Sequence, residues 1–218
     1  MYKLGKILPR GRLHKIITHH VVKRTNEFFF VQIGSNDGIM EDPIYDYILK
    51  YKWHGILVEP IKYLFDMLIK NYKKQEGLIF VNVGISNKNE SRTLYTLRKN
   101  NNLPYWVSGL GSFYLGNILK FKTLIPSIED YIVREKVKCI SFKTLIEKYS
   151  VKKIDLLCID TEGFDYQIIK QIDFDKLKPE MIFYEHTNLS KKDKKDCERL
   201  LRKNGYKLAR NSDNTLAY

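Results

Sequence analysis

Residues 28–38 read FFFVQIGSNDG, an apolar run that ends in a turn with a glycine at each end. Further apolar runs follow at 55–58 (GILV), 78–83 (LIFVNV), 154–159 (IDLLCI) and 181–184 (MIFY). Continuous rather than alternating apolar residues are typical of strands that are buried on both faces of a parallel sheet. The five runs therefore predict the core of such a sheet.

Helical patterns lie between several of these expected strands. Asp42 and Pro43 predict the start of one helix, and Pro60 opens a second. Ser190 with Asp193 resembles a capping box at the start of a third. Strands that alternate with helices predict a doubly wound α/β sheet, mostly parallel, with helices on both faces.

The segment at about 87–137 breaks this alternation. It holds an expected extra strand at 93–97 and a loop at 100–112, and insertions of this kind are commonly lids or binding loops. Residues 1–26 contain seven basic and no acidic residues, with apolar residues at helical spacing. They predict a basic helical extension, followed at 27–218 by a single domain with a lid-like insertion.

The composition limits the class of protein and its partners. The 218 residues are 44% hydrophobic, enough for one sizeable core. Lys and Arg outnumber Asp and Glu by 38 to 25, and the net charge of +13 favours nucleic acid, anionic lipid or acidic glycan partners. The cysteines Cys139, Cys158 and Cys197 are too few and too dispersed for a disulfide framework or a metal knuckle.

No apolar run reaches the roughly 18 residues that span a bilayer, and the chain starts without an apolar signal segment. With the scattered cysteines, which favour a reducing compartment, this pattern predicts a cytoplasmic protein.

Two strand ends predict a cofactor site, because ligands of doubly wound sheets bind beyond the carboxyl ends of the strands. The turn at 34–38 (GSNDG) lacks the G-x-G-x-x-G spacing that holds a pyrophosphate, which disfavours a dinucleotide. Glu59 follows about 20 residues later, the spacing of an acid that binds ribose hydroxyls. A structural glycine turn and a helix-start acid remain the alternatives. Together the two features favour a nucleoside cofactor such as S-adenosylmethionine.

The order of several motifs resembles the FkbM family of S-adenosylmethionine-dependent methyltransferases. These motifs, over about 28–188, are FVQIGSNDGIMEDPI, GILVEP, VNVGIS, SGLGSF and IDLLCIDTEGFDYQII. The resemblance implies a class I methyltransferase fold, Rossmann-like, with a seven-stranded sheet whose last strand is antiparallel. It also implies an O-methyltransferase, since members mostly methylate sugars or polyketide-type natural products.

The resemblance further implies which residues hold the cofactor. The turn from Gly34 to Gly38 would bind its methionine side, Glu59 its ribose, and Val83 and Gly84 its adenine. The full expected set is Gly34, Ser35, Asn36, Asp37, Gly38, Glu59, Pro60, Val83, Gly84 and Asp160. Many class I methyltransferases have an acid where Gln32 stands, so its contact to the cofactor would be neutral here, and Asp37 is a candidate to compensate.

The candidate catalytic residues follow two neighbouring strands: Asp160 and Glu162 after IDLLCI, Glu185 and His186 after MIFY. A sugar hydroxyl needs a positioned base to take its proton, and the pKa of His186 suits that role. Asp160 could orient the imidazole, or act as the base itself if burial raises its pKa.

The same side chains offer a second chemistry. Asp160, Glu185 and His186 could hold Mg²⁺ or Mn²⁺ to lower the pKa of the acceptor oxygen. A metal is not favoured, because residue types alone define no ligand geometry.

The aromatic loop is the candidate acceptor site. Trp106, Ser112 and Phe113 could close over a sugar ring, whose apolar side suits aromatic faces. The alternative is a surface loop that packs Trp106 into the core. An RNA or cap ribose methyltransferase, and a non-catalytic module that binds a polyanion or membrane, are the other two functions considered. The acceptor, the oligomeric state and the metal requirement stay open at this point.

Overall fold

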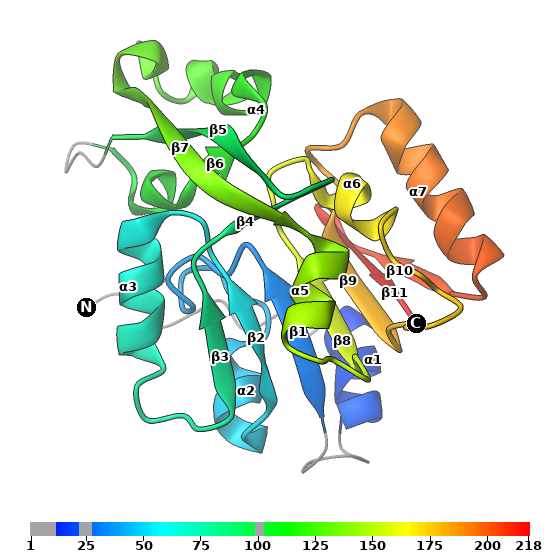
Figure 1. Ribbon diagram of the computed structural model, residues 1–218. Helices are drawn as coiled ribbons and strands as arrows, with labels where there is room; N and C mark the ends of the chain where they lie inside the picture. The colour runs from blue at the N-terminus through cyan, green and yellow to red at the C-terminus, as the bar shows by residue number, and fades with distance from the viewer. Residues whose placement is uncertain (1–11, 22–27, 99–102) are drawn as a thin grey trace.

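The computed structural model describes residues 12–21, 28–98 and 103–218, which form an α/β fold with two sheets (Figure 1). The larger sheet has seven strands in the order β10-β11-β9-β8-β1-β2-β3. These strands are β1 Phe29–Ile33, β2 His54–Val58, β3 Leu78–Val81, β8 Leu156–Ile159, β9 Met181–Glu185, β10 Leu208–Arg210 and β11 Asn214–Ala217. All neighbours are parallel except β11, which is antiparallel to both β9 and β10. The doubly wound sheet and its antiparallel last strand are confirmed.

Helices cover both faces of this sheet. On one face, α1 (Arg12–Val21), α2 (Tyr45–Tyr51) and α3 (Lys62–Asn71) pack on a core that includes Phe30 and Leu57. On the other face, α5 (Phe142–Lys148), α6 (Asp165–Ile169) and α7 (Lys191–Lys203) pack on a core that includes Val31 and Ile56. Adjacent strand residues thus point to opposite faces, both buried, as the continuous apolar runs predict.

Side-chain oxygens accept hydrogen bonds from backbone N–H groups at two of the predicted helix starts. Asp42 Oδ1 accepts from the backbone N–H of Ile44 and of Tyr45, so the helix α2 begins a little later than the Asp42–Pro43 pair predicts. Ser190 Oγ accepts from the N–H of Asp193 and caps α7, which confirms the expected cap.

Residues 84–141, which include the predicted insertion, form a second sheet, which Figure 1 shows above the strand ends of the first. Its strands, in the order β4-β7-β5-β6, are β4 Gly84–Ser86, β5 Glu90–Leu97, β6 Gly111–Ser112 and β7 Ile132–Ser141. The short helix α4 (Leu115–Leu119) and the 3₁₀ helices η1 (Tyr105–Gly109), η2 (Lys120–Thr123) and η3 (Ile128–Tyr131) complete it. The sequence predicts one extra strand here, at 93–97. The strand β7 is not predicted, because its solvent-facing positions are charged and it has no continuous apolar run.

The N-terminal helix α1 is part of the fold. Ile17 is fully buried in the core of the first face, and Thr18 Oγ1 lies 3.1 Å from the hydroxyl of Tyr47. The rest of the predicted extension, residues 1–11 and 22–26, lies outside the described residues, so the division at 26/27 stays a prediction. Within the described part of the chain, no helix has the length and apolarity to cross a membrane.

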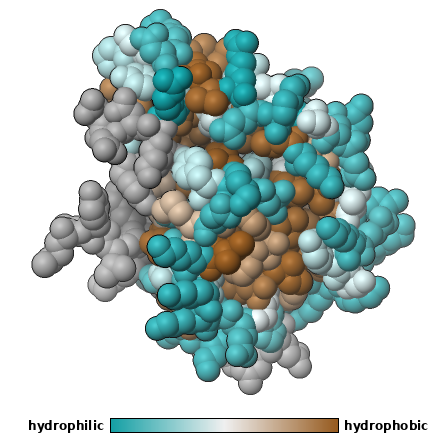
Figure 2. Space-filling view, turned by 60° about the vertical axis from the view of Figure 1, so that its left-hand side comes forward, coloured by the Kyte–Doolittle hydropathy of each residue, from teal (hydrophilic) through white to brown (hydrophobic). Residues whose placement is uncertain are grey.

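Few large apolar side chains are exposed on the described surface. Figure 2 shows the face that carries α3, where an apolar area near the centre is surrounded by hydrophilic residues. Ile69 on α3 and Ile79 on the edge strand β3 are 41% and 36% exposed. Leu124, after η2, is 70% exposed, the largest value among the large exposed apolar residues.

Asp155 joins the amino ends of β1 and β8. Its buried carboxylate accepts from the N–H of Phe29 at 2.7 Å and pairs with Lys153 Nζ at 2.7 Å. We expect Asp155→Ala to lower the free energy of unfolding by about 2 to 3 kcal/mol, because a buried donor is left unpaired. Urea denaturation measures the change. Asp175→Ala, at an exposed site, should shift stability by less than about 0.5 kcal/mol; equal effects of the two would contradict the prediction.

Candidate active site

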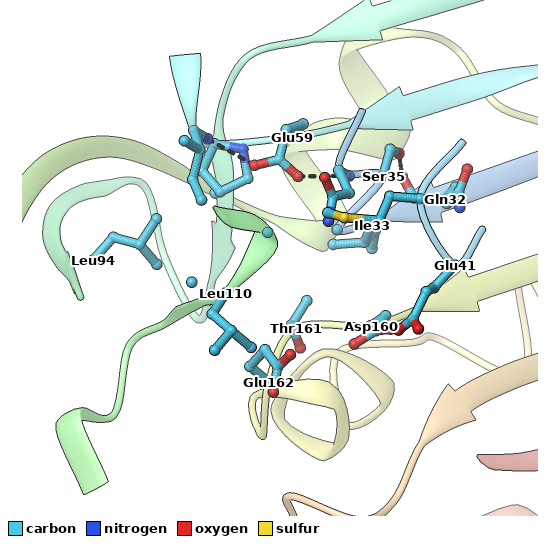
Figure 3. A pocket seen from close by; sticks show the side chains of 18 of the residues that line it. Gln32, Ile33, Ser35, Glu41, Glu59, Leu94, Leu110, Asp160, Thr161 and Glu162 are labelled. Carbon is cyan, nitrogen blue, oxygen red and sulfur yellow. Dashed lines mark hydrogen bonds between the residues drawn. The ribbon is translucent and has the colours of Figure 1, made fainter. Parts of the chain in front are cut away.

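A cavity of about 410 Å³ lies between the carboxyl ends of β1, β2 and β8 and the second sheet (Figure 3). The strand order reverses between β1 and β8, so the cavity lies at the switch point, where doubly wound sheets bind ligands. Its volume is within the range of small-molecule sites. The ends of β1, β2 and β8, which the sequence singled out, therefore meet at one site.

The backbone of the glycine turn lies very close to Asp160, the residue after β8. Gly34 has φ of +81°, and a Cβ at this residue would lie 1.7 Å from the backbone oxygen of Asp160. The N–H groups of Gly34 and Ser35 both donate to the backbone oxygen of Val58. Only glycine fits this position, and the turn holds Ser35 and Asn36 against the cavity.

Glu59 is a buried acid of the cavity, and both of its carboxylate oxygens are held by backbone donors. It is 4% exposed, and its Oε2 and Oε1 accept from the N–H groups of Asn36 and Ile61, each at 2.8 Å. Each carboxylate oxygen keeps a second lone pair for a ligand hydroxyl. Burial raises the pKa of Glu59 to about 7. This carboxylate spans the glycine turn and the start of α3, and Pro60, Val83 and Gly84 line the cavity beside it.

Asp37 and Gly38 do not line the cavity, although the sequence places them in the cofactor set. Asp37 Oδ1 accepts from the N–H groups of Ile39 and Met40, and a Cβ at Gly38 would collide with Tyr72. These two residues hold the turn in shape. The geometry gives no support to the idea that Asp37 replaces an acid at Gln32.

Gln32 lines the cavity as a buried neutral side chain. Its Nε2 donates to Asp42 Oδ2 at 3.2 Å, and Asp42 lines the cavity too. Burial raises the pKa of Asp42 to about 7. The neutral Gln32 thus lies next to an acid, Asp42, that precedes the next helix α2.

The floor of the cavity is acidic. Figure 3 shows Asp160 and Glu41 pointing toward one another from two different loops. Asp160 reaches solvent through the cavity, and the surrounding protein together with Glu41 raises its pKa to about 6. Glu162 lies beside them with its backbone in the left-handed region, at φ of +51°. Sequence reasoning missed Glu41, which follows no strand directly.

Glu162 and Glu185 share one hydrogen-bond donor, the amide of Asn188. Asn188 Nδ2 lies 2.7 Å from Glu162 Oε2 and 3.1 Å from both carboxylate oxygens of Glu185. Burial and the charge of Asp160 raise the pKa of both acids. The structure thus joins the two predicted strand ends, with Glu185 behind Glu162 rather than on the cavity surface.

His186 lies outside the cavity lining. Its ring nitrogen Nδ1 is 3.0 Å from Thr215 Oγ1, and its backbone N–H donates to the backbone oxygen of Asp213. Burial and the positive charge of Lys194 lower the pKa of His186. The structure therefore does not bring the imidazole next to Asp160. No group of three or more metal-binding side chains occurs in the part of the chain that the structure describes.

The second sheet supplies the opposite wall. Trp106 and Phe113 line the cavity as expected, but Ser112 is buried and does not. Ser112 Oγ donates to the backbone oxygen of Glu162 at 2.8 Å, and Asn117 Nδ2 donates to the same oxygen at 2.7 Å. Ser112 therefore fastens the second sheet to the acidic turn.

The buried acids should make stability depend on pH. Between the pKa of Glu59 in the unfolded chain, 4.5, and about 7 in the fold, the folded protein binds more protons, so the unfolding free energy falls as pH rises. Glu59 contributes on the order of 3 kcal/mol to this loss. We expect a higher Tm at pH 5.5 than at 7.5, with a smaller difference in Glu59→Gln. A scan in which wild type and variant change alike would contradict this assignment.

A seven-stranded sheet with an antiparallel last strand, a glycine turn after β1 and a buried acid after β2 together define a class I methyltransferase. The sequence profile of the methyltransferase FkbM domain matches residues 32–208, and the chain belongs to this family. It is an S-adenosylmethionine-dependent methyltransferase.

Solved structures with a similar fold share little sequence with the chain. Precorrin-6y C5,15-methyltransferase from Geobacter metallireducens is 11% identical, with a TM-score of 0.47 over 98% of this chain and 92% of that one. The METTL16 methyltransferase domain is 11% identical, with a TM-score of 0.48 over 94% of this chain and 65% of that one. Aeropyrum pernix fibrillarin, with natively bound S-adenosyl-L-methionine, is 7% identical, with a TM-score of 0.41 over 88% and 65%. No curated protein sequence matches.

Proposed function

We propose that this chain is an O-methyltransferase that transfers a methyl group from S-adenosylmethionine to a hydroxyl of a sugar or glycan-like acceptor. The observation that carries the proposal is Glu59, a buried carboxylate held by two backbone donors at the edge of the cavity. Its free lone pairs suit the two hydroxyls of a ribose. The glycine turn lies beside it, where the methionine end would bind.

The cofactor supplies an activated methyl group on a sulfonium, so the protein chiefly aligns the acceptor and takes up its proton. Gly34, Ser35 and Asn36 would hold the methionine end. Pro60, Val83 and Gly84 would border the adenine. All six residues line the cavity, which supports the fit of this cofactor to the donors and walls present.

Asp160 is the base that the geometry favours. It lines the cavity and is open to solvent, whereas His186 lies outside and is engaged with Thr215. The pKa of Asp160, raised to about 6, is close to the value at which a general base is both ionised and effective. Glu162, supported by Asn188 and Glu185, would orient the acceptor.

Methylation of RNA or of a cap ribose is the second candidate, supported by the net charge of +13. The cavity itself argues against a phosphate there. Its charged lining residues are all acidic: Glu41, Asp42, Glu59, Asp160 and Glu162. A non-catalytic module that binds a polyanion or membrane through residues 1–26 ranks third, because a formed cavity has no use in that role. The three cysteines are free and buried, which agrees with the cytoplasmic location that we propose.

The test is a transfer assay with isotopically labelled S-adenosylmethionine and separate pools of nucleotide sugars, neutral glycans and RNA, read by mass spectrometry. Label on a sugar hydroxyl is the expected result. Label on RNA would favour the second candidate, and folded protein that fails to bind S-adenosylhomocysteine in calorimetry would contradict both.

A further inference from the structure

The two walls of the cavity differ in chemistry. The strand ends of the main sheet present the acidic side chains, and among the described lining residues none is Lys, Arg or His. The second sheet presents a wall of large apolar side chains instead: Leu94, Trp106, Leu110, Phe113, Phe121 and Leu124. Figure 3 shows Leu94 and Leu110 on the side of the cavity opposite Gln32 and Glu41. A ligand that fits both walls must itself be two-sided.

Leu124 is the least expected member of the apolar wall, since 70% of it is exposed. Single exposed leucines are common on protein surfaces, but this one lies at the cavity beside Phe121, whose ring is 5.3 Å from that of Trp106. The N–H groups of Leu124 and of buried Ile125 both donate to the backbone oxygen of Phe121. The backbone therefore holds Leu124 in this exposed place.

The charges of the cavity decide what the occupant carries. An anionic acceptor would meet Asp160, Glu162 and Glu41 with no described cation in the lining to balance it, and like charges in a partly desolvated site repel strongly. Hydroxyl groups, by contrast, donate to carboxylates. A wholly polar acceptor would leave the apolar wall in contact with water, at a cost proportional to its area.

We infer that the acceptor is an uncharged amphipathic alcohol, whose hydroxyls face Asp160 and Glu162 and whose apolar part lies on Trp106, Phe121 and Leu124. The inference rests on the proposed function, because it places the acceptor in the same cavity as the cofactor. It assigns Leu124 a role in substrate specificity that no motif in the sequence indicates.

The probes are alkyl β-glucosides with methyl, hexyl and octyl chains, each titrated by calorimetry into the full chain with S-adenosylhomocysteine present, below micelle-forming concentrations. Each buried methylene is worth about a fourfold gain in affinity. Burial of only two methylenes of the chain should therefore make octyl glucoside bind at least about tenfold more tightly than methyl glucoside. Leu124→Ser should reduce this gain by about threefold or more. Octyl phosphate, with the same tail and an anionic head, should not bind measurably.

Ile69→Ser is the matched control, because Ile69 is also an exposed aliphatic residue but lies on α3 and outside the cavity lining. It should leave the chain-length series unchanged. An affinity that is independent of chain length, an equal loss in both variants, or equal binding of octyl phosphate would overturn the inference. Failure of S-adenosylhomocysteine itself to bind would instead count against the proposed function.

Discussion

Asp160→Asn is expected to lower kcat by about 10²- to 10⁴-fold, because the amide cannot take the proton of the acceptor hydroxyl. Affinity for S-adenosylhomocysteine should stay within about threefold, since the lost interaction matters mainly in the transition state. The amide also keeps the shape of the side chain, which reaches solvent through the cavity. Single-turnover kinetics and calorimetry measure the two quantities separately.

The pH profile gives an independent reading of the same residue. Desolvation by the surrounding protein and the charge of Glu41 raise the pKa of Asp160 to about 6, and a base works only when ionised, so kcat should fall as pH drops below that value. Asp175→Asn, on the exposed surface, should keep the wild-type profile. If Asp160→Asn kept the wild-type kcat and His186→Ala lost it, the general base would be His186 and not Asp160.

Glu59→Ala is expected to weaken S-adenosylhomocysteine binding by about 10²-fold or more, through the loss of two hydrogen bonds from the ribose to a charged acceptor. Glu59→Gln should also bind more weakly. Both oxygens of Glu59 accept from backbone N–H groups, so the amide of glutamine would set a donor against one of them. Calorimetry measures the affinity, and circular dichroism checks that each variant is folded.

The exposed residue Glu76, in the loop between α3 and β3, offers the control, and Glu76→Ala should bind the cofactor product as the wild type does. Wild-type affinity in Glu59→Ala would show that the nucleoside lies elsewhere. That result would contradict the assignment of Glu59 as the residue that binds the cofactor ribose.

Most of the main sheet could be predicted from the sequence, because strands that are buried on both faces leave long apolar runs. β1, β2, β8 and β9 begin and end within two residues of those runs. β10 and β11 are short and carry no such signal, and the second sheet has half-exposed strands with charged positions, as in β7. These elements are defined by their partners rather than by their own composition.

The candidate site divides in the same way. Glu59 and the glycine turn could be predicted because both directly follow strands whose ends meet. His186 also follows a strand. Its backbone N–H, however, donates to the backbone oxygen of Asp213 before β11, and its ring nitrogen Nδ1 lies within hydrogen-bond distance of Thr215 Oγ1. Three residues could not be predicted, because only the tertiary fold brings them to the site and no local sequence pattern marks them. Glu41 and Leu124 line the cavity, and Asn188 holds the side chain of Glu162.

The attachment of the second sheet has a consequence for how an acceptor arrives. Ser112 and Asn117 both donate to the backbone oxygen of Glu162, and Lys120 donates to Asn188, whose amide donates to the Glu162 side chain, so the second sheet and Glu162 are held at one turn. Moving the second sheet away from the main sheet would break these hydrogen bonds and displace Glu162, which we propose orients the acceptor. We therefore expect an acceptor to enter on the side of Leu124, the most exposed residue of the apolar wall, and exchanges at η2 and Leu124 to change the acceptor without disturbing Glu59 and the glycine turn.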